Sequence, residues 1–237
     1  MTHQTHPFDA YIQQPEDAIR VARAALLFAL DKHPGLDVDG YVARLDRLAD
    51  RVGRLDARDA LEQIAAIRTV LIEQEGLIGD LEDYANPANS YLNEVLDRRR
   101  GLPISLSVIW VDVARSLDWR FHGIGFPGHF LAACDTEQER LFLDPFRGGA
   151  LVSLDECISL LREQFGPDAE FEPALLDPCG PRATLTRMLN NLRIAYIEAE
   201  QWPDAIRVLR RLSALHPDDG DLTAQLQQVC NIQARLN

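Results

Sequence analysis

The sequence predicts an α+β fold that is mostly helical and includes a small antiparallel sheet. Apolar residues recur at helical spacing through the first ninety positions and again beyond about residue 155. Between about residues 120 and 144 the pattern changes to short apolar runs that are typical of β-strands and are separated by turn residues. We therefore expect a strand-containing centre with helices before and after it in the sequence.

Three helices are predicted in the first eighty residues. The first spans residues 15–32, and the second spans residues 38–52 after a turn at Asp37 that caps it. The third begins near Asp56, whose carboxylate is suited to an N-cap, and continues toward Gly76. Each places its apolar residues on one side, as expected for helices that cover a core.

A fourth helix is predicted from Tyr91 to Arg100, capped by Asn89 or Ser90 and followed by Gly101 as the left-handed residue after its end. Three consecutive arginines, 98–100, close this helix. They have two interpretations. They can form a phosphate or carboxylate site, or they can be cations placed favourably at a helix C-terminus.

Pro103 opens the next helix, PISLSVIWVDVARSLDW, which is apolar on nearly every face. A helix of this kind is buried on all sides. Ser105 lies in its first turn, where a serine is usually a cap or a small packing residue.

The following segments predict three strands, over residues 120–126, 129–134 and 139–144. A polar loop of four residues joins the last two, and symmetric pairing about it would place His129 opposite Asp144. Directly opposed side chains on one face lie close enough for a carboxylate to fix the imidazole tautomer and stabilise its protonated form. The plainer interpretation is a satisfied core histidine and an aspartate that starts a turn.

The order of Ser105, His129 and Asp144 along the chain resembles the order of the catalytic residues in the transglutaminase-like cysteine hydrolases. The segments NSYLNEVLDRRRGLPISLS, GFPGHFLA and LFLDPFRGG are similar to the SirB-type branch of that superfamily, and the similarity extends from about residue 15 to the C-terminus. The resemblance implies a papain-type core in which His129 is the base, Asp144 orients it, and Ser105 occupies the place of the nucleophilic cysteine. It also implies a tail of tetratricopeptide-type helices.

The serine departs from the family pattern in a way that affects mechanism. A helix N-terminus and an imidazolium can convert a thiol to thiolate. A hydroxyl instead needs concerted proton removal by an aligned base and a strong oxyanion hole. Two hypotheses follow: a non-catalytic binding or regulatory protein, or a peptidase, amidase or acyl transferase that uses Ser105, His129 and Asp144.

Residues 184–237 fit the spacing of a tetratricopeptide repeat and a half. Pro203 and Asp204 suit the first turn of its second helix. One and a half repeats cannot bury their own apolar faces, so the tail either covers the core or offers a groove to a partner. The predicted division is an N-terminal helical region packed on the core (1–85), a transglutaminase-like core (86–165), a connector (166–183) and this tail.

Composition limits the partners. The net charge of −13 disfavours nucleic acid and anionic membrane surfaces, which bind basic groups. We find neither a secretory signal at the start nor a membrane span. The four cysteines are isolated, as expected of reduced thiols in a cytoplasmic protein. We therefore expect a protein or peptide partner, no cofactor and no metal. His122 is near the site without an assigned role, and His3, His6 and His33 are assigned none.

Overall fold

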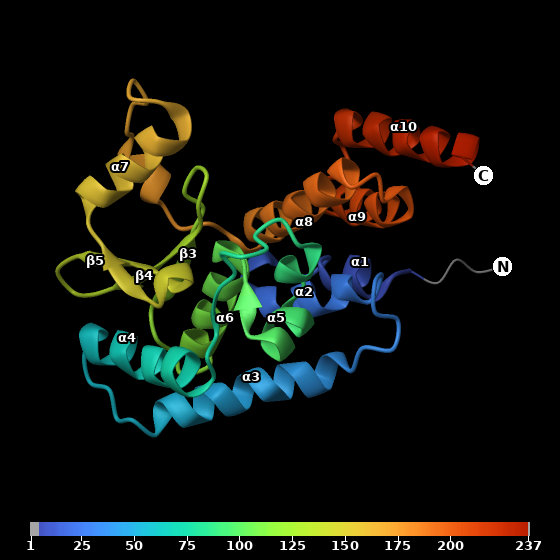
Figure 1. Cartoon of the computed structure of the whole chain (residues 1–237). Helices are drawn as coiled ribbons and strands as arrows, with labels where there is room; N and C mark the ends of the chain where they lie inside the picture. Colours follow the sequence, from blue (N-terminus) through green and yellow to red (C-terminus); the bar gives the residue numbers. More distant parts are fainter. Residues whose placement is uncertain (1–4, 237) are drawn as a thin grey trace.

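The computed structural model describes residues 5–236. The chain forms a helical bundle joined to a small sheet (Figure 1). Its helices are α1 (Pro7–Tyr11), α2 (Val21–Ala29), α3 (Val38–Gly53), α4 (Ala60–Arg68), α5 (Leu92–Arg98), α6 (Pro103–Arg115), α7 (Leu154–Phe165), α8 (Pro181–Glu198), α9 (Trp202–Leu215) and α10 (Gly220–Leu236). Its strands are β1 (Ile78–Gly79), β2 (Arg100–Gly101), β3 (Phe121–Ile124), β4 (Leu131–Asp135), β5 (Arg140–Asp144) and β6 (Ala150–Val152). The mostly helical α+β prediction is consistent with this architecture.

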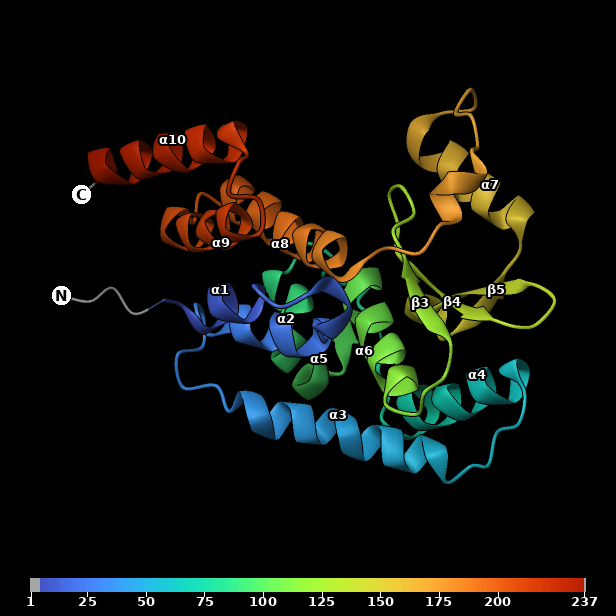
Figure 2. The ribbon, with the colours of Figure 1, turned by 180° about the vertical axis from the view of Figure 1, so that it is seen from behind.

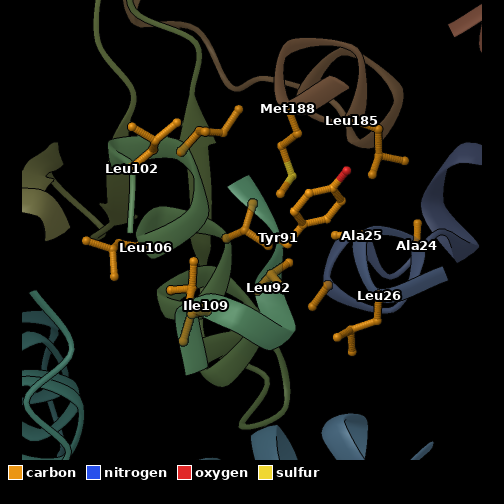
Figure 3. Packing of buried hydrophobic residues seen from close by; sticks show 14 of the residues in the cluster. Ala24, Ala25, Leu26, Tyr91, Leu92, Leu102, Leu106, Ile109, Leu185 and Met188 are labelled. Atoms are coloured by element: carbon orange, nitrogen blue, oxygen red, sulfur yellow. The ribbon is translucent and has the colours of Figure 1, made fainter. Parts of the chain in front are cut away.

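Helix α6 lies at the centre, with the sheet on one side, α2, α5 and α8 on the other, and α3 packed along it. Figure 2 shows the same arrangement from behind. Pro103 begins the helix, where its missing N–H is not needed. The apolar residues that follow are buried around the whole helix, as the sequence predicts. Side chains from α2, α5, α6 and α8 meet in one hydrophobic core around Tyr91 (Figure 3).

The four-stranded sheet is antiparallel in the order β3-β4-β5-β6. The predicted hairpin register was wrong by two residues. Asp135 pairs with Arg140, which shifts the four-residue loop by one position and places Leu131, rather than His129, opposite Asp144. The hydroxyl of Thr136 accepts hydrogen bonds from the backbone N–H groups of residues 138 and 139 and so fixes this loop. A shift of two residues keeps every side chain on its predicted face.

Two predicted helix ends were also wrong. The N-cap of α4 is Asp59, whose carboxylate accepts a hydrogen bond from Glu62 N–H at 2.9 Å, rather than Asp56. At the end of α5 the left-handed residue is Arg99, with φ of 62°, rather than Gly101. Gly101 is required for packing instead, because a Cβ there would lie 2.8 Å from Val95.

The start of α5 also differs from the prediction. Its N-cap is Tyr91, which makes no side-chain capping bond, whereas Asn89 and Ser90 belong to a preceding 3-10 turn (Pro87–Ser90). At α3 the expected cap is confirmed, because Asp37 accepts a hydrogen bond from Gly40 N–H at 2.9 Å.

Helices α8, α9 and α10 pack side by side at the C-terminal end of the chain. Helix α8 contributes Leu185, Met188, Leu189 and Leu192 to the main core, so it is part of the support for α6 rather than a separate unit. Arg211 of α9 binds Asp9 at 2.5 Å and Asp31 at 3.0 Å, which fastens α9 to the N-terminal helices. None of the helices within residues 5–236 has both the length and the apolar character required to traverse a bilayer.

Gly149 offers a test of the packing around α6. Its φ is +75°, and an added Cβ would overlap the ring of buried Trp110, so Gly149→Ala combines left-handed strain with overpacking. We expect a loss of about 2–5 kcal/mol of unfolding free energy, measured by chemical denaturation. The matched control is Gly148→Ala, at φ +71° with open space around it, for which we expect only about 1–2 kcal/mol. Equal losses in the two variants would show that the ring contact is not tight.

Candidate functional site

His129 and Asp144 come together at the end of the sheet. His129 lies in the turn just before β4 and reaches diagonally to Asp144, the last residue of β5, so that imidazole Nε2 is 2.9 Å from Oδ2. The Asp144 side chain is fully buried. Because Nε2–H donates to the carboxylate, Nδ1 is the ring nitrogen left for another partner.

The aspartate is held by the loop that follows it. Its Oδ1 accepts hydrogen bonds from the backbone N–H groups of Phe146 at 2.9 Å and Arg147 at 3.4 Å. The Arg147 guanidinium lies 3.6 Å from Oδ2. The ring of Phe146 meets the His129 ring edge to face, with centroids 6.2 Å apart. A carboxylate held from both oxygens cannot turn away, so the imidazole has a fixed orienting partner.

A cavity of about 150 Å³ opens beside His129. Pro103 and Ile104, the first residues of α6, form one wall, and Phe130 forms another. The site therefore has an oriented imidazole at the N-terminus of a buried helix, which is the arrangement that nucleophilic catalysis by a thiol requires.

Ser105 is placed differently. Its side chain is fully buried, and its hydroxyl donates a hydrogen bond to the carbonyl oxygen of Asn89 at 2.7 Å. Within residues 5–236 that hydroxyl makes no hydrogen bond to His129, and the residues of the first turn that line the cavity are Pro103 and Ile104 rather than Ser105. The hydroxyl thus joins α6 to the preceding 3-10 turn.

Two residues of α8 line the same cavity, Arg187 and Asn191. Sequence reasoning missed both. Arg187 donates to the backbone carbonyl of His129 at 2.9 Å although the two residues are 58 positions apart, so no local pattern could have linked them. Their position on α8 means that this helix builds part of the site.

Histidines away from this site have structural partners where the structure describes them. His122 binds Asp135 at 2.8 Å on the sheet, where hydrogen bonds from Arg140 and His122 lower the pKa of that aspartate. His6 caps α1, and burial lowers its pKa. His33 lies 3.5 Å from Glu94, and His3 lies outside the described residues.

The cysteines show no sign of reactivity at this site. All four are unpaired, and Cys134 and Cys157 are buried. Burial raises the pKa of Cys134 to about 11 and raises that of Cys157. In the described part of the chain, no three His, Cys, Asp or Glu side chains gather closely enough to hold a metal ion.

The comparison with known families decides the classification. The model of the transglutaminase-like superfamily matches residues 39–190, which include His129, Asp144 and Arg187. The chain belongs to the transglutaminase-like superfamily. The matched region of this transglutaminase-like protein runs from α3 into α8 and includes every residue that lines the cavity beside His129 except Asn191.

Individual relatives of the transglutaminase-like chain support the assignment. A UPF0162 protein of Xylella fastidiosa (strain Temecula1) is 34% identical over 213 residues, which cover 86% of this chain and 74% of that protein. A UPF0162 protein of Pseudomonas aeruginosa is 30% identical over 88% of this chain and 76% of its own length. F-box only protein 21 of Mus musculus is 32% identical over 135 residues, which are 54% of this chain and 21% of that protein. No solved structure shows significant similarity.

Cysteine substitutions distinguish the two candidate nucleophile positions of this transglutaminase-like site. We expect Ile104→Cys to react with iodoacetamide at pH 7 about tenfold faster than Ser105→Cys, because only position 104 borders the cavity beside the imidazole and helix N-terminus. The rate at each position is measured by site-resolved mass spectrometry, which separates it from the native cysteines. Adding His129→Ala should remove the advantage. Faster reaction at position 105 would show that the Ser105 side chain does face the site.

Proposed function

We propose that this chain is a degenerate transglutaminase-like protein of SirB type that does not turn over substrate and instead holds a peptide or protein segment in the cleft beside His129. The observation that carries the proposal is the Ser105 hydroxyl, which is fully buried and bound to the Asn89 carbonyl. An alcohol in that position lacks the aligned base that its high pKa demands. Pro103 and Ile104, the residues of the same turn that line the cavity, carry no nucleophilic atom.

The remaining site is suited to binding. His129 is oriented by Asp144, the cavity is open, and Asn191 supplies an amide that can both donate and accept hydrogen bonds. Apolar walls with a few fixed polar groups are the usual composition of a ligand site. The match to a segment covering 21% of F-box only protein 21 supports a module that can serve within a larger protein.

The C-terminal helices enter the proposal as a tetratricopeptide-type unit with two roles. Helix α8 supports the core and lines the cleft, whereas α9 and α10 form an outer surface for a partner. The proposed units are the N-terminal helices (1–85), the core (86–165), the connector (166–183) and the tail (184–237). The unpaired cysteines support a reducing, cytoplasmic location.

A serine-directed fluorophosphonate tests the absence of turnover. We expect the wild type and Ser105→Ala to be labelled equally, because the Ser105 hydroxyl is buried and donates its hydrogen bond to the Asn89 carbonyl oxygen. Labelling is followed by gel fluorescence, with a known serine hydrolase as the positive control. Labelling of the wild type that disappears in Ser105→Ala and in His129→Ala would establish the Ser105, His129 and Asp144 hydrolase instead.

Filling the cavity tests the binding role. Asn191→Trp places a large side chain in the cleft, whereas Ile194→Trp, at a half-exposed position of the same helix, leaves the cleft open. In quantitative pull-downs we expect proteins captured by the wild type and Ile194→Trp to be lost from Asn191→Trp, with all three folded by circular dichroism. Unchanged capture by Asn191→Trp would show that the cleft is not the binding site. Removing the chain after residue 180 is unsuitable, because it would delete α8 from the core.

A further inference from the structure

Arg187 is a half-buried cation that points its guanidinium toward the turn carrying His129. Its Nη2 donates to the carbonyl oxygens of Phe126 at 2.8 Å and His129 at 2.9 Å, and its Cζ lies 5.4 Å from the centre of the Phe130 ring. The Nη1 and Nε groups make no hydrogen bond to any residue between 5 and 236. Nη2 therefore fixes the side chain, while Nη1, which lies beside Gly125 and Cys179, and Nε remain free to donate.

No carboxylate among residues 5–236 lies within 4.0 Å of the Arg187 guanidinium nitrogens, the distance at which an ion pair forms. Three other arginines that are partly or fully buried pair with an acid: Arg20 with Asp112, Arg98 with Asp80, and Arg211 with Asp31. Burial also lowers the pKa of Arg187, which an anion close to it would oppose. A charge taken from water without a counter-ion is unfavourable, so the arrangement favours an anion from outside.

The cavity that Arg187 lines has the matching chemistry. Its wall includes Asn191 and His129 but no Asp or Glu. In a protein with a net charge of −13, a cavity with one cation and no acid is a local exception. An anion that enters it meets donors, and the carboxylate closest to the wall, that of Asp144, is bound to the His129 imidazole and to Arg147.

We propose that the cavity beside His129 takes the carboxylate of a peptide, bound by the charge of Arg187 and the amide of Asn191. A volume of about 150 Å³ is close to that of a cavity that holds benzene, so it admits one side chain or one chain end rather than a whole peptide. A phosphate carries nearly two charges and usually meets several arginines, whereas a single arginine matches a single carboxylate. The carboxylate is that of an Asp or Glu side chain or of a C-terminus. This inference names the ligand chemistry of the proposed binding cleft and rests on that function.

Small carboxylates test the proposal on the full chain. The probes are N-acetylglycine, which mimics a C-terminus, and N-acetylglutamate N-methylamide, which presents an acidic side chain, each compared with its carboxamide analogue. Binding is followed by nuclear magnetic resonance of the Arg187 Nε–H and Asn191 side-chain signals, assigned with Arg187→Lys and Asn191→Asp. We expect saturable shifts with at least one carboxylate and none with the amides. The probe that binds more tightly identifies the source of the carboxylate.

Variants separate the charge from the fold. Arg187→Gln should weaken the carboxylate by about tenfold to a hundredfold, because a charge-assisted hydrogen bond is lost. Arg187→Lys, which keeps the charge, should retain part of the affinity. Arg193→Gln is the matched control on the same helix, since Arg193 binds Gln225. The affinity of the Arg193→Gln variant for the carboxylate should equal that of the wild type. Thermal unfolding of each variant shows whether the fold is intact.

Three results would overturn the inference: equal binding of acids and amides, unchanged affinity in a folded Arg187→Gln variant, or tighter binding of methyl phosphate than of either carboxylate. These are independent of the serine-directed labelling. Carboxylate binding together with Ser105-dependent labelling would leave Arg187 as a substrate-binding residue of an active hydrolase. Absence of both would leave a non-catalytic protein whose cleft takes a different ligand.

Discussion

Helix α6 is apolar on nearly every face, and the rest of the fold follows from the need to surround it. A short sheet can cover only one side of such a helix, so the chain covers the others with helices drawn from both ends of the sequence. This explains why α8, more than sixty residues after α6, is as much a part of the core as α2. It also fixes the first turn of α6 between the sheet and α8, where the cavity lies.

Much of this fold could be predicted from the sequence because it depends on local periodicity. The apolar pattern on nearly every face of residues 103–119 predicts a buried helix, and the short apolar runs and turns of residues 120–144 predict adjoining strands. What the sequence could not supply was the position of turns and caps. A polar loop can be closed at residues 135–138 or 136–139 with similar composition, and the hydrogen bonds of Thr136 decide between them. The sequence predicts a left-handed cap at Gly101, whereas the structure requires glycine there because the Val95 side chain leaves no room for a Cβ.

The same distinction applies to the site. Strand pairing alone predicts that His129 and Asp144 lie close together. They meet despite the altered register because a shift of two residues keeps both side chains on the same face of the sheet. The role expected of Ser105 depended on the rotation of α6 about its axis, which no motif encodes. Arg187 depended on a contact between elements far apart in the chain. The base and its acid are thus properties of one hairpin, whereas the surroundings that determine their chemistry are properties of the whole fold.

One guanidinium group, that of Arg187, joins α8 to the backbone of the turn that carries His129. Since Nη2 of Arg187 holds the backbone of residues 126 and 129, a displacement of α8 along its axis must move the turn on which the histidine stands. Ligand binding in the cleft and partner binding to α9 and α10 can therefore change each other's binding free energy through the hydrogen bonds of Arg187. Thermodynamic linkage requires that effect to be equal in both directions.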